Sequence, residues 1–265
     1  YIVPSNIYRK TFHLSWRYLI AEQNMTETLK IDKLTKRFGP KTVVDNVTFV
    51  ANKGEVLGFL GPNGAGKSTT MKMVVGFLSP TSGTASVCGH DIIENPLEVK
   101  RAVGYLPEGA PAYPDMTPHS FLKFIASIRG FRGSEKIDRV ENAINITRIE
   151  DVSRQPIETL SKGYKRRVGL AQSLIHDPEV LILDEPTDGL DPNQKQVVRD
   201  LIRSMATEKC IVISTHILEE VDAVCTRAMI IASGKVVADG SPEELKSQSG
   251  AGDLDEVFRK VTKNA

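Results

Sequence analysis

The sequence predicts an α/β fold with a mostly parallel core sheet. Short apolar runs recur along the chain with helical patterns between them, at Val56–Leu60, Val103–Leu106, Val180–Leu183, Ile211–Ser214 and Met229–Ile231. Several of these runs are apolar at every position, as strands buried on both faces are, and their alternation with helices favours a parallel arrangement. A single strand–loop–helix segment with the phosphate-loop pattern supports the same fold class.

The length, the net charge and the cysteine content of the chain limit the classes of function. A chain of 265 residues fits one large domain or two small ones. Because 34 Lys and Arg residues balance 33 Asp and Glu residues, the net charge of +1 gives no field that attracts nucleic acid, and we expect no nucleic-acid partner. Cys88, Cys210 and Cys225 are odd in number and widely spaced, which is typical of reduced thiols in a cytosolic protein. No apolar run approaches the roughly 20 residues that cross a bilayer.

Residues 1–24 are expected to be an N-terminal extension, which was either added artificially or translated from sequence upstream of the natural start. Met25 has the character of a natural start, because the strand-like Thr28–Ile31 follows it at once. The extension contains basic and aromatic residues, namely Arg9, Lys10, Arg17, Phe12, Trp16 and Tyr18. A targeting or membrane-surface segment is therefore the alternative interpretation.

Residues from about 108 to 175 interrupt the alternation of strands and helices. Prolines cluster at Pro107, Pro111, Pro114 and Pro118, and mostly helical patterns follow without a clear strand. This segment is predicted to be a helical insertion within a domain over residues 25–240.

A short helical tail is expected over residues 241–265. Ser241 is placed to cap a helix that begins at Pro242. Further along, Leu254, Val257, Phe258 and Val261 repeat at the spacing of one helical face.

The segment after Val56–Leu60 fits the pattern G-x-x-x-x-G-K-[ST], with a strand before it and a helix after it. Glycines let backbone N–H groups turn inward, and the following helix directs its positive end at the same place, so the loop is suited to phosphates. Lys67 would supply a cation for the β- and γ-phosphates, and Ser68 would offer its hydroxyl to Mg²⁺. The expected phosphate-binding residues are Gly61, Pro62, Asn63, Gly64, Ala65, Gly66, Lys67, Ser68 and Thr69.

Two acids follow the buried strand Val180–Leu183. The carboxyl ends of strands in open parallel sheets face the ligand crevice, which favours a functional pair. We expect Asp184 to hold hydrated Mg²⁺ and Glu185 to orient and polarise the attacking water. The alternative is a pair of acids that merely closes a strand.

His216 follows a second buried strand, Cys210–Ser214. A lone histidine is usually structural, but this position beside a carboxylate strand end favours the same site. The imidazole is predicted to bridge the γ-phosphate and Glu185.

Leu160–Leu174 begins with a Ser-x-Gly turn and continues as a basic amphipathic helix. Ser161 as N-cap and the free N–H groups near Gly163 would form an anion site at the helix N-terminus. An ordinary capped helix with a solvated face at Lys165, Arg166 and Arg167 is the alternative.

Taken together, these motifs resemble the nucleotide-binding subunit of ATP-binding cassette (ABC) transporters, from Leu29 to Gly240. Leu160–Tyr164 matches the Leu-Ser-Gly-Gly-Gln signature of that family, with Lys162 and Tyr164 departing from it. The resemblance implies a phosphate-loop ABC ATPase fold with an antiparallel β subdomain near the N-terminus and a helical insertion that carries the signature. It also implies that Ser161 and Gly163 bind the γ-phosphate of a nucleotide held by a second copy.

The resemblance also assigns further positions one at a time. Phe38 matches the aromatic residue that stacks on adenine. Gly189–Asp191 matches a loop at the dimer interface, with Asp188 where small residues are common. Glu108 falls where most members carry a Gln that contacts Mg²⁺ and water, so its carboxylate either binds the metal or links to the membrane partner.

The implied function is Mg²⁺-dependent ATP hydrolysis by a homodimer that drives a separate membrane permease from the cytoplasmic face. Glu108, the Leu-Ser-Lys-Gly-Tyr signature and Asp255–Phe258 resemble the ATPase subunits of ABC-2-type exporters, including gliding-motility, multidrug and polysaccharide export types. The motifs do not specify the cargo.

Two alternatives remain. One is a soluble cassette ATPase that acts on DNA or the ribosome, although the sequence has no heptad run and only one cassette. The other is a phosphate-loop kinase for a small substrate, which would leave Ser161–Gly163 without a role.

Overall fold

The computed structural model describes residues 27–110, 112–249 and 253–263. The predicted extension over residues 1–24 and the predicted start at Met25 lie outside these ranges. No helix in the described part of the chain has both the length and the apolar character that a membrane crossing requires.

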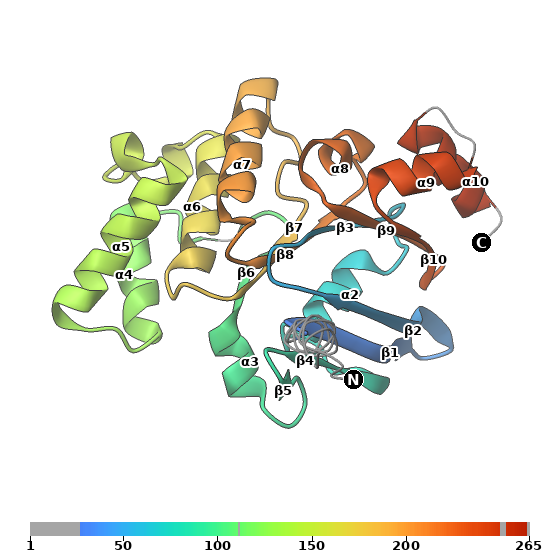
Figure 1. Ribbon diagram of the computed structural model, residues 1–265. Helices are drawn as coiled ribbons and strands as arrows, with labels where there is room; N and C mark the ends of the chain where they lie inside the picture. Colours follow the sequence, from blue (N-terminus) through green and yellow to red (C-terminus); the bar gives the residue numbers. More distant parts are fainter. Residues whose placement is uncertain (1–26, 111, 250–252, 264–265) are drawn as a thin grey trace, which may run out of the picture.

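A six-stranded sheet with the order β10-β9-β3-β8-β7-β6 forms the centre of the molecule (Figure 1). Its strands are β3 (Val56–Leu60), β6 (Val103–Leu106), β7 (Val180–Asp184), β8 (Cys210–Thr215), β9 (Arg227–Ala232) and β10 (Lys235–Gly240). All neighbours pair in parallel except β9 and β10. The predicted parallel sheet is therefore confirmed, and each of the five apolar runs forms one of its strands.

A second sheet is antiparallel throughout and has the order β2-β1-β4-β5. Its strands are β1 (Leu29–Phe38), β2 (Lys41–Ala51), β4 (Ser82–Val87) and β5 (His90–Asp91). Helix α2 (Lys67–Val74) lies between the two sheets in Figure 1 and buries Met71, Met73 and Val74 in their shared core. The Phe49 and Phe59 rings, 5.6 Å apart, join the sheets directly. This confirms the antiparallel β subdomain.

The helical insertion lies at one side of the parallel sheet, at the left of Figure 1. It contains α4 (Pro118–Ile128), α5 (Gly133–Thr147), α6 (Lys162–Leu174) and the short 3₁₀ turns η1 (Glu150–Val152) and η2 (Ile157–Thr159). The helices enclose a core of their own around Phe121, Leu122, Val140, Ile144 and Val168. As predicted, the described residues between β6 and β7 include no strand.

The remaining helices are α3 (Pro96–Ala102), α7 (Pro192–Met205), α8 (Leu218–Val224), α9 (Pro242–Ser249) and α10 (Leu254–Lys263). The predicted cap of α9 is confirmed: Ser241 Oγ accepts from the Glu244 N–H at 3.2 Å, and Glu244 Oε2 accepts from the Ser241 N–H at 2.8 Å. This reciprocal pair is a capping box. In the tail, Leu254 and Val257 pack with Ile230 of β9, which anchors α10 to the sheet.

The three cysteines carry free thiols. Burial raises the pKa of Cys88 to about 11 and the pKa values of Cys210 and Cys225 to about 12. Because the thiolate is the reactive form of cysteine, these raised pKa values disfavour reactivity at all three thiols.

Candidate active site

The phosphate-loop segment connects β3 to α2 and requires glycine at Gly66. This residue is the N-cap of α2 and has φ of 105° and ψ of 0°, a backbone conformation that L side chains rarely adopt. A Cβ atom there would also lie 2.6 Å from the carbonyl oxygen of Val43. The close approach of β2 and the left-handed turn together give the loop its shape at the start of the helix.

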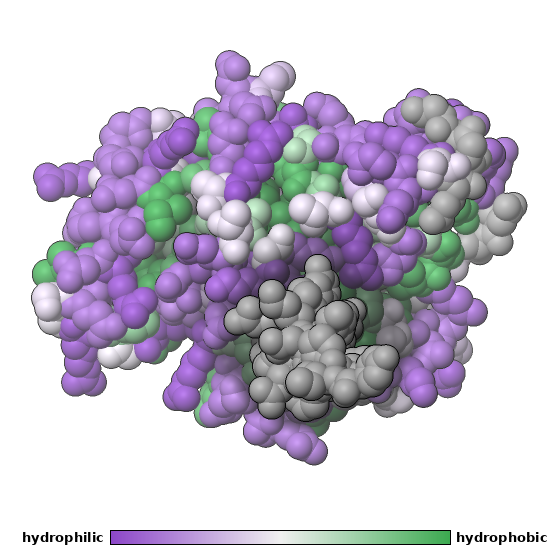
Figure 2. All heavy atoms as spheres, viewed as in Figure 1, coloured by the Kyte–Doolittle hydropathy of each residue, from purple (hydrophilic) through white to green (hydrophobic). Residues whose placement is uncertain are grey.

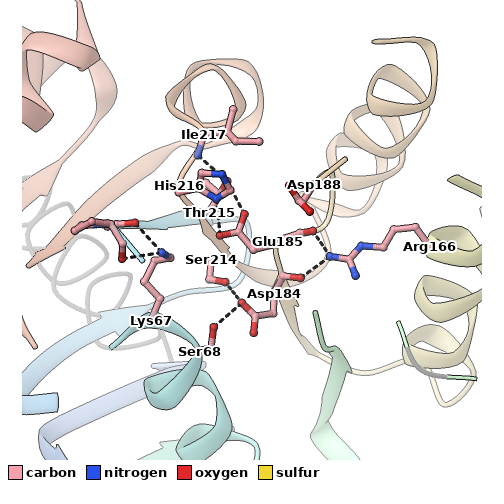
Figure 3. Close-up of polar contacts among 12 residues, drawn as sticks. Lys67, Ser68, Arg166, Asp184, Glu185, Asp188, Ser214, Thr215, His216 and Ile217 are labelled. Carbon is pink, nitrogen blue, oxygen red and sulfur yellow. Dashed lines mark hydrogen bonds and ion pairs between the residues drawn. The ribbon is translucent and has the colours of Figure 1, made fainter. Parts of the chain in front are cut away.

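Lys67, the first residue of α2, lies over the loop that precedes it. Its side chain is buried, and Nζ donates to the carbonyl oxygens of Gly61 at 2.6 Å and Pro62 at 3.3 Å (Figure 3). Burial lowers the pKa of the ammonium, and the charges of Glu185, Asp184 and Glu108 oppose this effect. An ammonium group has three donors, so these two contacts leave one for a phosphate oxygen.

Asp184 is the last residue of β7 and is 1% exposed. Its Oδ1 accepts from Ser68 Oγ at 3.2 Å and from Ser214 Oγ of the neighbouring strand β8. A carboxylate and a hydroxyl are oxygen ligands of the kind that Mg²⁺ prefers. Within the described ranges no three His, Cys, Asp or Glu side chains converge as a complete metal site. The Ser68 hydroxyl and the Asp184 carboxylate fit Mg²⁺, which usually binds to proteins through one or two such ligands and keeps waters and substrate phosphates as the others.

Glu185 follows in a left-handed conformation with φ of 50°. Its N–H donates to the carbonyl oxygen of Ser214 at 2.9 Å. On its side chain, Oε1 lies 2.9 Å from His216 Nδ1, and Oε2 accepts from Thr215 Oγ1 at 3.4 Å. A left-handed non-glycine residue costs on the order of 1 kcal/mol or more, and such strain clusters at functional sites. The surrounding hydrogen bonds hold the carboxylate in a defined direction.

These groups surround a cavity of about 520 Å³. Its lining comprises Val43, Asn63, Gly64, Gly66, Lys67, Ser68, Thr69, Glu108, Glu185, Asp188 and His216. Most of the predicted phosphate, metal and catalytic residues thus converge on one place. Figure 2 shows that the face turned to the viewer is mainly hydrophilic, with apolar residues in scattered patches.

Some predicted residues lie outside this lining. Gly61 and Pro62 accept hydrogen bonds from Lys67 through their carbonyl groups, and Ala65 is buried. Asp184 accepts a hydrogen bond from Ser68, which does line the cavity. Phe38 is half exposed at the end of β1. Phe38 is not part of the cavity lining, so its contact with adenine stays a prediction.

Ser161 and Gly163 also stay outside the cavity, at the start of α6. The predicted cap is confirmed, since Ser161 Oγ accepts from the Tyr164 N–H at 3.4 Å. A Cβ atom on Gly163 would lie 2.5 Å from Gln194 Oε1 of α7, so the turn is closely packed. The next side chain, Lys162, forms a 3.4 Å ion pair with Asp188 of the cavity lining. This exposed ion pair connects the turn to the lining of the chain's own cavity.

Sequence reasoning missed several site residues. Ser214 and Thr215 support Asp184 and Glu185, and their place beside His216 at the end of β8 was the available signal. The alternative of a solvated face at Arg166 and Arg167 is wrong, because these side chains are 6% and 5% exposed. Arg166 precedes the buried Leu170 by four residues, a helical spacing that places both on one face.

Comparison with known proteins identifies the family. The ABC transporter family model matches residues 44–188. Nod factor export ATP-binding protein I of Ralstonia nicotianae is 36% identical over 234 residues, which cover 88% of this chain and 73% of that protein. The probable multidrug ABC transporter ATP-binding protein YbhF of Escherichia coli is 38% identical over 225 residues, which cover 83% of this chain and 38% of YbhF.

Solved structures agree with the sequence relatives. The ATP-binding subunit of an ABC transporter has a TM-score of 0.80 and 29% identity, over 89% of this chain and 99% of that one. The cbiO1 protein of Clostridium perfringens, part of the ABC transporter complex cbiONQ, has a TM-score of 0.77 and 29% identity, over 89% of this chain and 94% of its own. The chain therefore belongs to the ABC transporter family, as an ATP-binding subunit.

Proposed function

We propose that the chain is a Mg²⁺-dependent ATPase whose two copies close head to tail around two ATP molecules and drive a separate membrane permease. One observation carries the proposal. Residues of the phosphate loop line one cavity with Glu185 and His216, and Asp184 is hydrogen-bonded to Ser68 of that lining, while the capped turn at Ser161 lies outside the lining on the same chain. An anion site outside the chain's own nucleotide cavity is explained by a nucleotide on a second copy.

The phosphate-loop residues, Asp184, Glu185 and His216 each have a role in this proposal. The backbone of the phosphate loop and Lys67 bind the β- and γ-phosphates, and Ser68 with Asp184 would hold Mg²⁺. The metal, when bound, neutralises charge between these phosphates. Glu185 accepts a hydrogen bond from the attacking water and orients it toward the γ-phosphate. His216 fixes the Glu185 carboxylate through their 2.9 Å contact and reaches the γ-phosphate with its other nitrogen.

Two further residues, one in the cavity lining and one outside it, have proposed roles. Glu108 places a carboxylate in the lining, where it either adds a metal ligand or responds to the permease. Phe38, half exposed at the rim of the antiparallel sheet, stacks on adenine. Residues 25–240 form the ATP-binding domain in this proposal, and residues 241–265 form an appended tail.

The proposed partner is the permease of an ABC-2-type exporter, with this subunit on the cytoplasmic face of the membrane. Two relatives support export, since one is named for Nod factor export and the other for multidrug transport. The cbiO1 neighbour, part of the complex cbiONQ, supports assembly with other subunits.

The experiment uses a Glu185→Gln variant, which retains the cavity but removes the group that orients water. With Mg²⁺ and saturating ATP, light scattering after gel filtration should report a dimer, and ATP hydrolysis should be very slow. Adding Ser161→Arg should abolish the dimer while ATP binding to the monomer persists. Ser127→Arg, an equal change at an exposed position of α4, should leave the dimer intact. A Glu185→Gln chain that stays monomeric at saturating ATP would overturn the head-to-tail site.

A further inference from the structure

Arg166 occupies a place where an arginine is seldom found. Its side chain is 6% exposed, between α6 and the end of β7, and every hydrogen bond that the described residues give it goes to a backbone carbonyl oxygen. Buried arginines normally pair with a carboxylate, because an unpaired buried charge is costly. Because Arg166 donates only to backbone carbonyl groups within the described part of the chain, its role depends on which segments of the backbone it holds in place.

The guanidinium holds three consecutive residues at the end of β7. Nη2 donates to the carbonyl oxygen of Asp184 at 2.7 Å and also to that of Glu185, and Nε donates to that of Pro186 at 3.1 Å. Figure 3 shows Arg166 reaching the strand end from the side opposite Ser68 and Lys67. The backbone that carries Glu185 is thus fixed from outside the cavity.

This contact coincides with the strained residue of the site. Glu185 has φ of 50°, so its peptide groups turn away from the pattern of the strand. A left-handed glutamate persists only where its surroundings over-determine it. The three carbonyl contacts from Arg166 and the N–H contact to Ser214 together supply that constraint.

The same side chain also reaches the segment that follows β6. Nη1 donates to the carbonyl oxygen of Pro107 at 3.1 Å, and the next residue, Glu108, lines the cavity. Through its hydrogen bonds, the Arg166 side chain therefore links α6 both to the end of β7, which carries Glu185, and to the segment that carries Glu108. Since Ser161 is the N-cap of α6, the helix that would meet the partner's nucleotide also holds the chain's own Glu185.

We propose that Arg166 is a positioning residue that holds Glu185 in its working conformation and ties that conformation to the position of α6. This inference rests on the proposed role of Glu185 in hydrolysis. Burial lowers the pKa of Arg166, while the negative charges of Asp184, Asp188, Glu185 and Glu108 oppose that change, so the four acids favour the charged form.

The neighbouring Arg167 provides a matched control. It is equally buried on the same helix, and it donates to the carbonyl oxygens of Thr147 and Arg148, where α5 ends in a left-handed residue with φ of 53°. Its guanidinium also stacks 4.1 Å from the Tyr164 ring. Both arginines thus secure the end of another element, but only Arg166 contacts the strand end that carries Glu185.

The first experiment compares steady-state ATP hydrolysis of Arg166→Gln, Arg166→Lys and Arg167→Gln. Arg166→Gln should lower kcat on the order of 10²-fold with little change in KM for ATP, because a small displacement of a catalytic group has such an effect. Arg166→Lys keeps the charge but loses the fork of donors, so it should lie between the parent and Arg166→Gln. Arg167→Gln should lower thermal stability and retain kcat per folded molecule.

A second experiment separates positioning from general loss of structure. Each Arg166 variant is combined with Glu185→Gln, and single-turnover hydrolysis of radiolabelled ATP is measured. If Arg166 acts through Glu185, the substitution should cause no further loss in that background. Equal losses in both backgrounds, or a parental kcat for both Arg166 variants, would overturn the inference.

The two proposals fail in different ways. A parent protein without ATPase activity would remove the proposed function. An active parent whose Arg166→Lys and Arg167→Gln variants lose kcat alike would remove only the inference. Should Arg166→Gln fail to fold, Arg166→Lys carries the same comparison, with near-ultraviolet circular dichroism as the check on its tertiary structure.

Discussion

His216 Nδ1 lies 2.9 Å from Glu185 Oε1, and this contact joins the ends of two neighbouring parallel strands. Asp184 pairs with Ser214 in the β7–β8 ladder, so the residues that follow emerge side by side at the carboxyl edge of the sheet. Thr215 adds a second contact to the same carboxylate. The end of β8 therefore sets the direction of the Glu185 side chain.

This relationship predicts the effect of His216→Ala. The variant should lower kcat for ATP on the order of 10²-fold, because a group that orients the base and meets the developing charge acts mainly in the transition state. The affinity for ATP, measured with a fluorescent analogue, should change little. His90→Ala, at an exposed position of β5, should match the parent. Parental kcat in His216→Ala would show that Glu185 needs no such support.

Phe38 yields a prediction about nucleotide affinity. Stacking of a base on an aromatic ring contributes about 1–3 kcal/mol. Phe38→Ala should therefore weaken ATP binding by roughly 5- to 150-fold, and Phe38→Trp should restore it. Phe77→Ala, which removes a ring that is 80% exposed, serves as the control in the same fluorescence titration. An unchanged dissociation constant for Phe38→Ala would exclude this ring from the adenine site.

Much of the fold was predictable because local patterns and tertiary packing agree. Fully apolar runs such as Val180–Leu183 have few uses other than as central strands of a parallel sheet. Ser241 and Ser161 were recognisable as helix caps because a hydroxyl there satisfies N–H groups that the helix itself leaves free. The phosphate loop was identifiable for a similar reason, since its glycines are required by backbone geometry.

What escaped prediction depends on contacts between distant segments. The burial of Arg166 requires carbonyl groups from β7 and from Pro107, which are far away in sequence. The left-handed conformation of Glu185 likewise has no local signal, since only its environment stabilises it. The pairing of Lys162 with Asp188 also arises only once α6 packs beside the end of β7.

Gly104 in β6 yields a prediction about packing. A Cβ atom there would lie 2.3 Å from the carbonyl oxygen of Ser173 and 2.8 Å from Pro178 Cγ, so α6 and β6 approach too closely for any side chain. Gly104→Ala should destabilise the fold by about 1–3 kcal/mol, as overpacking does. Urea unfolding measures the change. Gly240→Ala, whose nearest contact would be the Glu244 side chain at 3.2 Å, should cost less. Equal losses would contradict the close approach of the helix.

His176 predicts how stability depends on pH. Nε2 donates to the carbonyl oxygen of Val103 at 3.0 Å, whereas the buried Nδ1 has no hydrogen-bond partner among the described residues. Burial, with the charges of Arg129, Arg139 and Lys209, lowers the pKa of His176 to about 4 from the ordinary value of 6.5, although the Val103 contact opposes this.

Between pH 6.5 and about 4 the unfolded chain binds a proton at His176 that the folded chain does not bind. Stability should therefore fall as the pH decreases through this window, and the loss should be complete below the pKa of the folded state. Since one pKa unit corresponds to about 1.4 kcal/mol, the loss is on the order of 3 kcal/mol. Urea unfolding at several pH values should show a shallower dependence for His176→Gln than for the parent, while His90→Gln follows the parent. Parallel curves for the parent and His176→Gln would mean that His176 titrates alike in the folded and unfolded chains.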